Sequence, residues 1–176
     1  MMHHIVVVGA PGSGKTTVVR RTIDLLRARG APVFGFWTGE IRQAGGRVGF
    51  DIESASGARE IMAHMDFRRG PAVSKYRVDV EAVKHVAVAE IRRALGAGAS
   101  GAVLVVDEIG KMELFSEEFR AAVMAALESP LRVLATAMSK PHPFVDAIKA
   151  RDDVEIVRVT SGNRDGLPDE LARRLA

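Results

Sequence analysis

Eight consecutive residues near the start of the sequence have the types and spacing of a phosphate-binding loop. They match the pattern G-x-x-x-x-G-K-[ST] in full: Gly9, Ala10, Pro11, Gly12, Ser13, Gly14, Lys15 and Thr16. Glycines in such a loop let backbone N–H groups close around phosphate oxygens, and the start of the following helix adds partial positive charge. The Lys15 ammonium can reach the β- and γ-phosphates, and the Thr16 hydroxyl can bind Mg²⁺. We therefore predict that this loop, together with Thr17, binds the phosphates of a nucleotide.

An acidic pair, Asp107 and Glu108, follows the apolar run VLVV, which is typical of a buried strand. Ligands of an open α/β sheet bind at the carboxyl ends of its strands. We predict that Asp107 and Thr16 are the protein contacts to Mg²⁺. The carboxylate of Glu108 could orient or deprotonate a water in line with the γ-phosphate, which makes Lys15 and Glu108 the predicted catalytic residues. The alternative for Glu108 is a turn cap or an ion pair with Lys111.

A third pair, Asn163 and Arg164, follows the last strand that the pattern predicts. Arg164 could stack on a purine face, and Asn163 could hydrogen-bond the edge of the base. We predict that both contact the nucleotide, with helix capping by Asn163 or Asp165 as the alternative.

Four further polar residues are not assigned to the site. Arg42 and Arg47 could neutralise phosphate charge or could be exposed strand residues. Lys75 could approach the nucleotide or lie on an edge strand. His142 lies between two prolines and is expected to be a loop residue without a catalytic role.

The elements that must position these residues alternate between strands and helices, which predicts an α/β fold with a mostly parallel sheet. Buried strands are expected at Ile5–Val8, Val33–Thr38, Ala102–Val106, Leu131–Thr136 and Val154–Val159. Helices are expected at Thr17–Arg29, from an N-cap at Asp79 to Leu95, from an N-cap at Ser116 to Glu128, at Phe144–Arg151 and at Pro168–Leu175.

A β-rich insertion is expected at residues 39–78, inside a single domain of residues 1–176. Glu40–Ala44 and Arg47–Glu53 flank the pair Gly45-Gly46, which indicates a β-hairpin because glycine tolerates positive φ. Ala58–His64 and Ala72–Val78 are expected to add further strands.

The composition is that of one globular domain, with 176 residues of which 47% are hydrophobic. There is no cysteine, which excludes disulfides and thiolate metal sites and agrees with a cytoplasmic setting. No apolar run is long enough to span a membrane and no secretory signal pattern is present, so no membrane partner is expected. The formal net charge of +3 is mild and no basic stripe is present, so nucleic acid is not expected as a partner. The protein is expected to be a monomer.

The chain also resembles the THEP-type nucleoside-triphosphatase family. The residues that carry this resemblance, in order, are Gly9–Thr17, Gly35–Arg42, Arg47–Asp51, Lys75-Tyr76 with Val78-Asp79, Asp107–Leu114, His142-Pro143 and Asn163–Pro168. Trp37, Ser74 and Gly166 depart from the residues that are usual in the family. The resemblance implies a P-loop, RecA-like α/β fold with helices on both faces of the sheet. It also implies Mg²⁺-dependent hydrolysis of nucleoside triphosphates, ATP and GTP among them, to the diphosphate and phosphate.

Two other functions use the same phosphate loop. One is a nucleotide or small-molecule kinase, and the other is a nucleotide-dependent switch or nucleic-acid ATPase. The position of Glu108 favours water as the acceptor, and the sequence has no clear motif for a second substrate or for DNA. Hydrolysis is therefore the predicted reaction.

Overall fold

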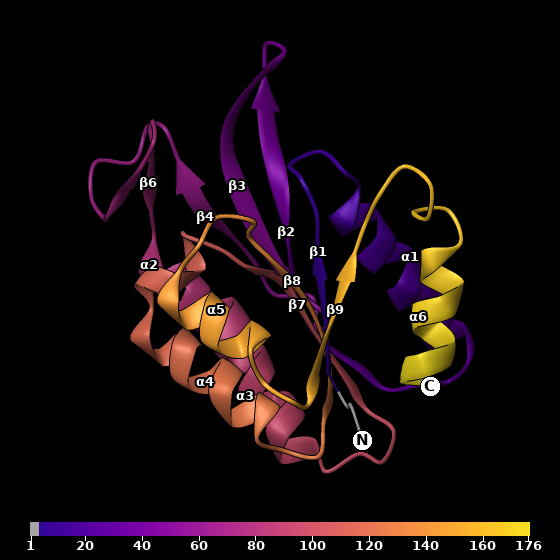
Figure 1. Ribbon diagram of the computed structural model, residues 1–176. Coiled ribbons are helices and arrows are strands. Elements are labelled where there is room, and N and C mark those ends of the chain that lie inside the picture. The colour runs from indigo at the N-terminus through magenta and orange to yellow at the C-terminus, as the bar shows by residue number, and fades with distance from the viewer. Residues whose placement is uncertain (1–3) are drawn as a thin grey trace.

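The computed structural model describes residues 4–176, and within them a nine-stranded sheet has the order β5-β6-β4-β3-β2-β7-β8-β1-β9. Residues 1–3, which the predicted single domain includes, lie outside the described residues. Figure 1 shows the sheet with α1 and α6 on one face and α3, α4 and α5 on the other. The predicted α/β fold with helices on both faces is confirmed.

One half of the sheet is parallel and carries the motifs. Its strands are β1 (His4–Val8), β2 (Val33–Gln43), β7 (Val103–Ile109), β8 (Arg132–Ala137) and β9 (Val154–Arg158). Apolar runs such as VVV at residues 6–8 are buried on both faces, as a parallel strand between two helical layers requires. All these strands end at the same edge, and Figure 1 shows the ends of β1 and β9 there.

The other half of the sheet is antiparallel and comes from the insertion. Its strands are β3 (Gly46–Ser54), β4 (Arg59–His64), β5 (Ala72–Val73) and β6 (Tyr76–Val78). β2 continues five residues beyond the predicted end at Thr38 to form the first arm of the predicted hairpin. The segment Ala72–Val78 is not one strand, because a turn with Ser74 at φ 54° divides it into β5 and β6.

Two helices, α2 and α4, begin at the predicted caps. The Asp79 side chain accepts hydrogen bonds from the N–H groups of Glu81 and Ala82, and the Ser116 hydroxyl accepts one from Phe119. The helices are α1 (Lys15–Ala28), α2 (Val80–Val83), the π-helical turn η1 (Lys84–Val88), α3 (Ala89–Ala97), the 3₁₀ turn η2 (Glu113–Phe115), α4 (Glu117–Leu127), α5 (Pro143–Lys149) and α6 (Leu167–Leu175). α1 starts two residues earlier than predicted, so Lys15 and Thr16 form its first turn.

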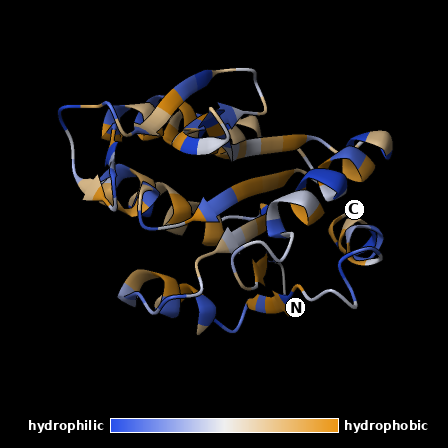
Figure 2. Ribbon diagram, turned by 90° about the horizontal axis from the view of Figure 1, so that it is seen from above, coloured by the Kyte–Doolittle hydropathy of each residue, from blue (hydrophilic) through white to orange (hydrophobic). Residues whose placement is uncertain are grey.

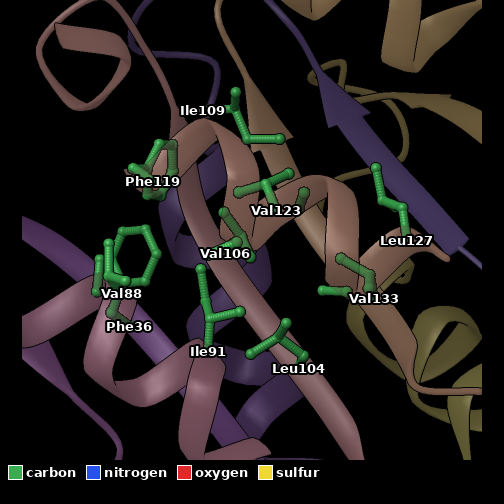
Figure 3. Close-up of a cluster of buried hydrophobic side chains, with 14 of the residues drawn as sticks. Phe36, Val88, Ile91, Leu104, Val106, Ile109, Phe119, Val123, Leu127 and Val133 are labelled. Atoms are coloured by element: carbon green, nitrogen blue, oxygen red, sulfur yellow. The ribbon is translucent and has the colours of Figure 1, made fainter. Parts of the chain in front are cut away.

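Two hydrophobic clusters hold these layers together, one on each face of the sheet. In the cluster of Figure 3, Phe36 of β2 meets Phe119 of α4 edge to face, with ring centroids 5.8 Å apart. Hydrophobic colour runs along the central strands in Figure 2, between the helical layers. Burial of each such side chain stabilises the fold by roughly 1.5–3 kcal/mol. The packed core therefore holds the carboxyl ends of the central strands in fixed positions.

Gly35 sets the spacing between β2 and β7 just below that edge. Its φ is 118°, and a Cβ added there would lie 1.9 Å from the carbonyl oxygen of Val105. Only glycine allows this close approach of the two backbones. Two residues further along, Trp37 lies in register with Asp107, so this close approach helps to fix the position of Asp107 within β7.

No helix within residues 4–176 is long and apolar enough to cross a membrane.

Candidate active site

The phosphate loop connects the end of β1 to the start of α1 at the carboxyl edge of the sheet. Gly12 and Gly14 have φ of 75° and 99°, which L side chains rarely adopt. No side chain caps α1, and its first turn has no acidic residue, so its leading N–H groups remain directed at the loop. This arrangement is the one that favours an anion at a helix N-terminus.

Lys15 folds back across this loop. Its ammonium donates hydrogen bonds to the carbonyl oxygens of Gly9, at 2.9 Å, and Ala10, at 3.3 Å. The hydroxyl of Ser139, after β8, also donates to Gly9, at 2.8 Å. The Ser13 hydroxyl is buried without a hydrogen-bond partner among the described residues. The loop therefore holds one cation and one unpaired polar group at its centre.

Asp107 is 2% exposed at the end of β7. Its Oδ1 accepts a hydrogen bond of 2.5 Å from Thr136 on β8, and its Oδ2 is buried with no partner in the described part of the chain. Burial is the largest effect and raises the pKa of Asp107 above its ordinary value, although the nearby hydroxyls of Thr136 and Thr16 and the charges of Arg20 and Lys15 lower it in part.

The residues around Asp107 fit the predicted magnesium ion. Oδ2 is a buried carboxylate oxygen with no hydrogen-bond partner among residues 4–176, the Thr16 hydroxyl lies near this carboxylate, and Mg²⁺ prefers oxygen ligands. Residues 4–176 contain no cluster of three or more His, Cys, Asp or Glu side chains that could hold a metal by themselves. A cation here would therefore depend on phosphate oxygens and water for its remaining ligands, as Mg²⁺ usually does.

Glu108 follows Asp107 across a cis peptide bond and is partly exposed. Burial is the largest effect that raises the pKa of Glu108, and the charge of the Asp107 carboxylate is the second. The charge of Lys15 lowers this pKa in part. Its carboxylate has no hydrogen bond or ion pair with any described residue, so the alternative ion pair with Lys111 is not formed. The carboxylate is available to a molecule in the site.

Sequence reasoning assigned no role to Glu113, a buried carboxyl group beside Glu108. A Cβ added to Gly110 would lie 2.7 Å from Oε1 of Glu108 and 2.9 Å from Oε2 of Glu113, so the two carboxyl groups flank this glycine. Burial, with the nearby Glu108 charge as the second cause, raises the pKa of Glu113 to about 8. Glu113 is therefore protonated at neutral pH. Its presence in the signature Asp107–Leu114 was the one signal in the sequence.

Two pockets meet at Lys15 and Glu108. The first, the phosphate-side pocket, has a volume of about 590 Å³. Of the predicted site residues, it brings together Gly12, Gly14, Lys15, Thr16, Thr17, Asp107 and Glu108. The insertion contributes Gly39, Glu40 and Phe50, and Thr38 of β2 precedes it. Sequence reasoning did not place these residues here, because the hairpin reaches the site only through the sheet.

Of the predicted nucleotide contacts after β9, Arg164 lies over the loop and Asn163 is occupied elsewhere. A Cβ on Gly14 would lie 3.8 Å from Cδ of Arg164. The Asn163 carboxamide accepts from the N–H of Thr160 and donates to the carbonyl of Arg158, both at 2.8 Å. It thus holds the turn after β9. It does not cap α6, whose N-cap is Gly166.

Arg42 and Arg47 are paired within the insertion. Each donates to Glu40 at 2.8 Å, and Arg47 also donates to the Tyr76 hydroxyl at 3.1 Å. The ammonium of Lys75 lies 5.4 Å from the Tyr76 ring centroid. The contacts of Arg42 and Arg47 support their interpretation as exposed strand residues, whereas Lys75 lies in the turn between β5 and β6 and not on an edge strand.

His142 forms a hydrogen bond with the backbone at the start of α5. Its Nδ1 accepts a hydrogen bond of 3.2 Å from the N–H of Phe144, which makes it the N-cap of α5. This geometry agrees with the predicted loop role.

Comparison with known proteins gives one consistent result. The model of the NTPase family matches residues 4–172. The chain is 42% identical to the nucleoside-triphosphatase THEP1 of Natranaerobius thermophilus, over 98% of this chain and 96% of that protein. It is 38% identical to the human cancer-related nucleoside-triphosphatase, over 96% and 95%.

Two solved structures share the fold over nearly the whole chain. The crystal structure of THEP1 from Aquifex aeolicus superposes with a TM-score of 0.88 at 32% identity, covering 98% of both chains. The solution structure of the human cancer-related nucleoside triphosphatase gives 0.86 at 36% identity, covering 98% of this chain and 97% of that one.

Proposed function

This chain belongs to the NTPase family and is a nucleoside-triphosphatase, and on that basis we propose the details of its reaction. It hydrolyses ATP, GTP and other nucleoside triphosphates to the diphosphate and phosphate, with Mg²⁺ bound and with the attacking water held by Glu108. The observation that carries this proposal is the carboxylate of Glu108, which has no hydrogen bond or ion pair with any described residue and lines both pockets together with Lys15.

The phosphates bind at the loop and the start of α1. The N–H groups of the loop and the positive end of the helix hold the β-phosphate. The Lys15 ammonium exchanges its carbonyl contacts with Gly9 and Ala10 for phosphate oxygens. A charge-assisted hydrogen bond is roughly twice as strong as a neutral one, which favours this exchange.

Thr16 and Asp107 would hold Mg²⁺ through the hydroxyl and the unpaired Oδ2. When bound, Mg²⁺ neutralises charge that develops on the phosphate oxygens. The hydrogen bond from Thr136 fixes the other oxygen of Asp107, so Oδ2 keeps one direction.

Glu108 accepts the proton of the attacking water. The water oxygen forms a bond to the γ-phosphorus, and the bond from that phosphorus to the bridging oxygen breaks. The electron pair of the broken bond goes to the β-phosphate oxygen, next to Lys15 and the loop N–H groups, which stabilise its charge. The raised pKa of Glu108 makes it a better proton acceptor than an ordinary carboxylate.

We also propose that the working enzyme is a monomer in the cytoplasm. All the proposed contacts to phosphate, metal and water come from one chain, which supports a monomer. A sedimentation experiment with and without nucleotide tests this, and a nucleotide-dependent dimer would contradict it.

The decisive experiment compares the parent with Glu108→Gln in single-turnover hydrolysis and in nucleotide titration. The variant keeps the size of the side chain and loses the basic oxygen. We expect near-parent affinity for Mg²⁺–ATP and a kcat lower by about 10²–10⁴-fold, the usual contribution of a positioned general base. Glu117→Gln, on the exposed first turn of α4, is the matched control.

The same data separate the alternatives. Near-parent hydrolysis by Glu108→Gln would remove Glu108 from the mechanism and favour a kinase, whose acceptor hydroxyl is activated elsewhere. Very slow hydrolysis by the parent, accelerated only when a nucleic acid or another partner is added, would favour a switch or a nucleic-acid ATPase.

A further inference from the structure

A second pocket, the far-side pocket, opens on the other side of Lys15 and Glu108. It has a volume of about 680 Å³, which lies in the range of pockets for small organic ligands. The η2 turn after β7 forms one wall, and the loop from β8 to α5 forms the other. The proposed hydrolysis needs only its inner end, where Lys15 and Glu108 lie.

The walls of the far-side pocket are apolar. Leu114 and Phe115 come from η2, and Met138 and Pro141 come from the facing loop. Phe115 is 38% exposed, and few other large hydrophobic side chains of the described residues are exposed to this degree. An aromatic or aliphatic group would bind to such a surface through the hydrophobic effect, whereas the phosphates of a nucleotide would not.

The same pocket has two cations that no carboxylate neutralises. Neither Lys111 nor Lys140 forms an ion pair or hydrogen bond with another residue in the described part of the chain. The one acidic residue that lines the pocket in residues 4–176 is Glu108, at the inner end. With Lys15, the lining therefore has three cations and one anion, which attracts negatively charged ligands.

We propose that the far-side pocket binds a small amphipathic organic anion while the nucleotide occupies the phosphate-side pocket. The apolar part of this ligand packs on Phe115, Leu114 and Met138, and its anionic group lies between Lys111 and Lys140. Because Glu108 lines both pockets, the bound ligand excludes water from the Glu108 carboxylate and slows hydrolysis. Binding of the ligand does not itself depend on the proposed role of Glu108.

The probe is 8-anilinonaphthalene-1-sulfonate, an aromatic anion whose fluorescence rises in apolar surroundings. The full chain is titrated with saturating Mg²⁺–ADP present, so that the nucleotide site is filled. We expect saturable binding at one site. Phe115→Ala and the double variant Lys111→Gln/Lys140→Gln should each raise the Kd at least about fivefold, the effect of one lost contact of moderate strength.

Two control variants distinguish binding in this pocket from nonspecific binding of the probe elsewhere on the surface. Ile156→Ala removes another exposed hydrophobic side chain, and Lys75→Gln removes a lysine outside the pocket. Both should leave the Kd unchanged. The uncharged analogue N-phenyl-1-naphthylamine should lose affinity with Phe115→Ala but not with the double lysine variant, because it has no anionic group.

Three results would overturn the proposal. They are displacement of the probe by Mg²⁺–ADP, an equal rise in the Kd of the probe in the control variants, or a Kd that does not change in Phe115→Ala and in the double lysine variant. Because ADP is not hydrolysed, none of these results depends on turnover. The effect on the reaction is measured separately, with ATP as substrate. We expect the probe to lower kcat without raising KM, and a purely competitive pattern would place it in the nucleotide site.

Discussion

Glu113→Gln should stabilise the folded protein, and the gain should grow with pH. The Glu113 side chain is 3% exposed, and burial together with the Glu108 charge raises its pKa to about 8. In the unfolded chain the same carboxyl group titrates near its ordinary value of 4.5. Glutamine keeps the shape and an accepting oxygen, and it removes this titration.

The sign and size follow from these two pKa values. Below pH 4.5 the group is protonated in both states and does not affect the pH dependence of unfolding. Between 4.5 and about 8 the unfolded chain releases the proton while the folded one keeps it, so stability falls by about 1.4 kcal/mol per pH unit. The difference of 3.5 units amounts to about 5 kcal/mol above pH 8, and the 2.5 units reached at pH 7 amount to about 3 kcal/mol.

The assay is urea unfolding of the parent and of Glu113→Gln at pH 5, 7 and 8.5. We expect the free energy of unfolding of the variant to exceed that of the parent by an amount that increases across this series. Groups that titrate in both proteins cancel in the difference. Glu117→Gln, with a side chain 91% exposed, is the control and should show no such trend. A difference between Glu113→Gln and the parent that stays constant from pH 5 to 8.5 would refute the reasoning.

The remaining predictions concern the loop, the metal and the sheet. Lys15→Ala should weaken binding of nucleoside triphosphate by about 1.5–3 kcal/mol and abolish turnover, and parent-rate hydrolysis in a phosphate-release assay would disprove the loop assignment. EDTA should stop hydrolysis and Mg²⁺ restore it, with a higher Mg²⁺ requirement in Asp107→Asn; full activity in metal-free buffer would contradict this. Gly35→Ala should destabilise the fold by at least about 3 kcal/mol in urea unfolding, because its Cβ meets the Val105 backbone. Gly96→Ala, in α3 with open space around it, should instead stabilise by about 0.4–1 kcal/mol, so equal effects of the two would be inconsistent with the clash.

Structural features that depend only on residues close together in the sequence could be predicted from the sequence alone. The phosphate loop, the N-caps Asp79 and Ser116 and the hairpin around Gly45-Gly46 depend on neighbours within a few positions. For such features the chemistry of glycine, hydroxyl and carboxylate side chains decides the geometry locally. The alternation of apolar strands and helices likewise predicted the α/β class, because short continuous apolar runs indicate strands buried on both faces and amphipathic segments between them indicate the covering helices.

Other features depend on which distant segments meet, and a local pattern does not contain that information. Thr136 and Asp107 are 29 positions apart in the sequence, and they form a hydrogen bond because their strands, β8 and β7, are neighbours in the sheet. The burial that keeps Glu113 protonated is also a property of the packed fold, because desolvation is set by everything that surrounds the carboxyl group.

The same limit applies to the two pockets. The sequence showed which residues could bind phosphate, but the apolar far-side pocket forms only where the η2 turn faces the loop after β8. Asn163 illustrates the opposite case, since its type suggested a nucleotide contact and the turn after β9 uses its carboxamide instead. The sequence by itself thus determined the chemistry available to this protein, and tertiary packing decided which groups are desolvated, paired or left free, because those states depend on neighbours brought together by the sheet.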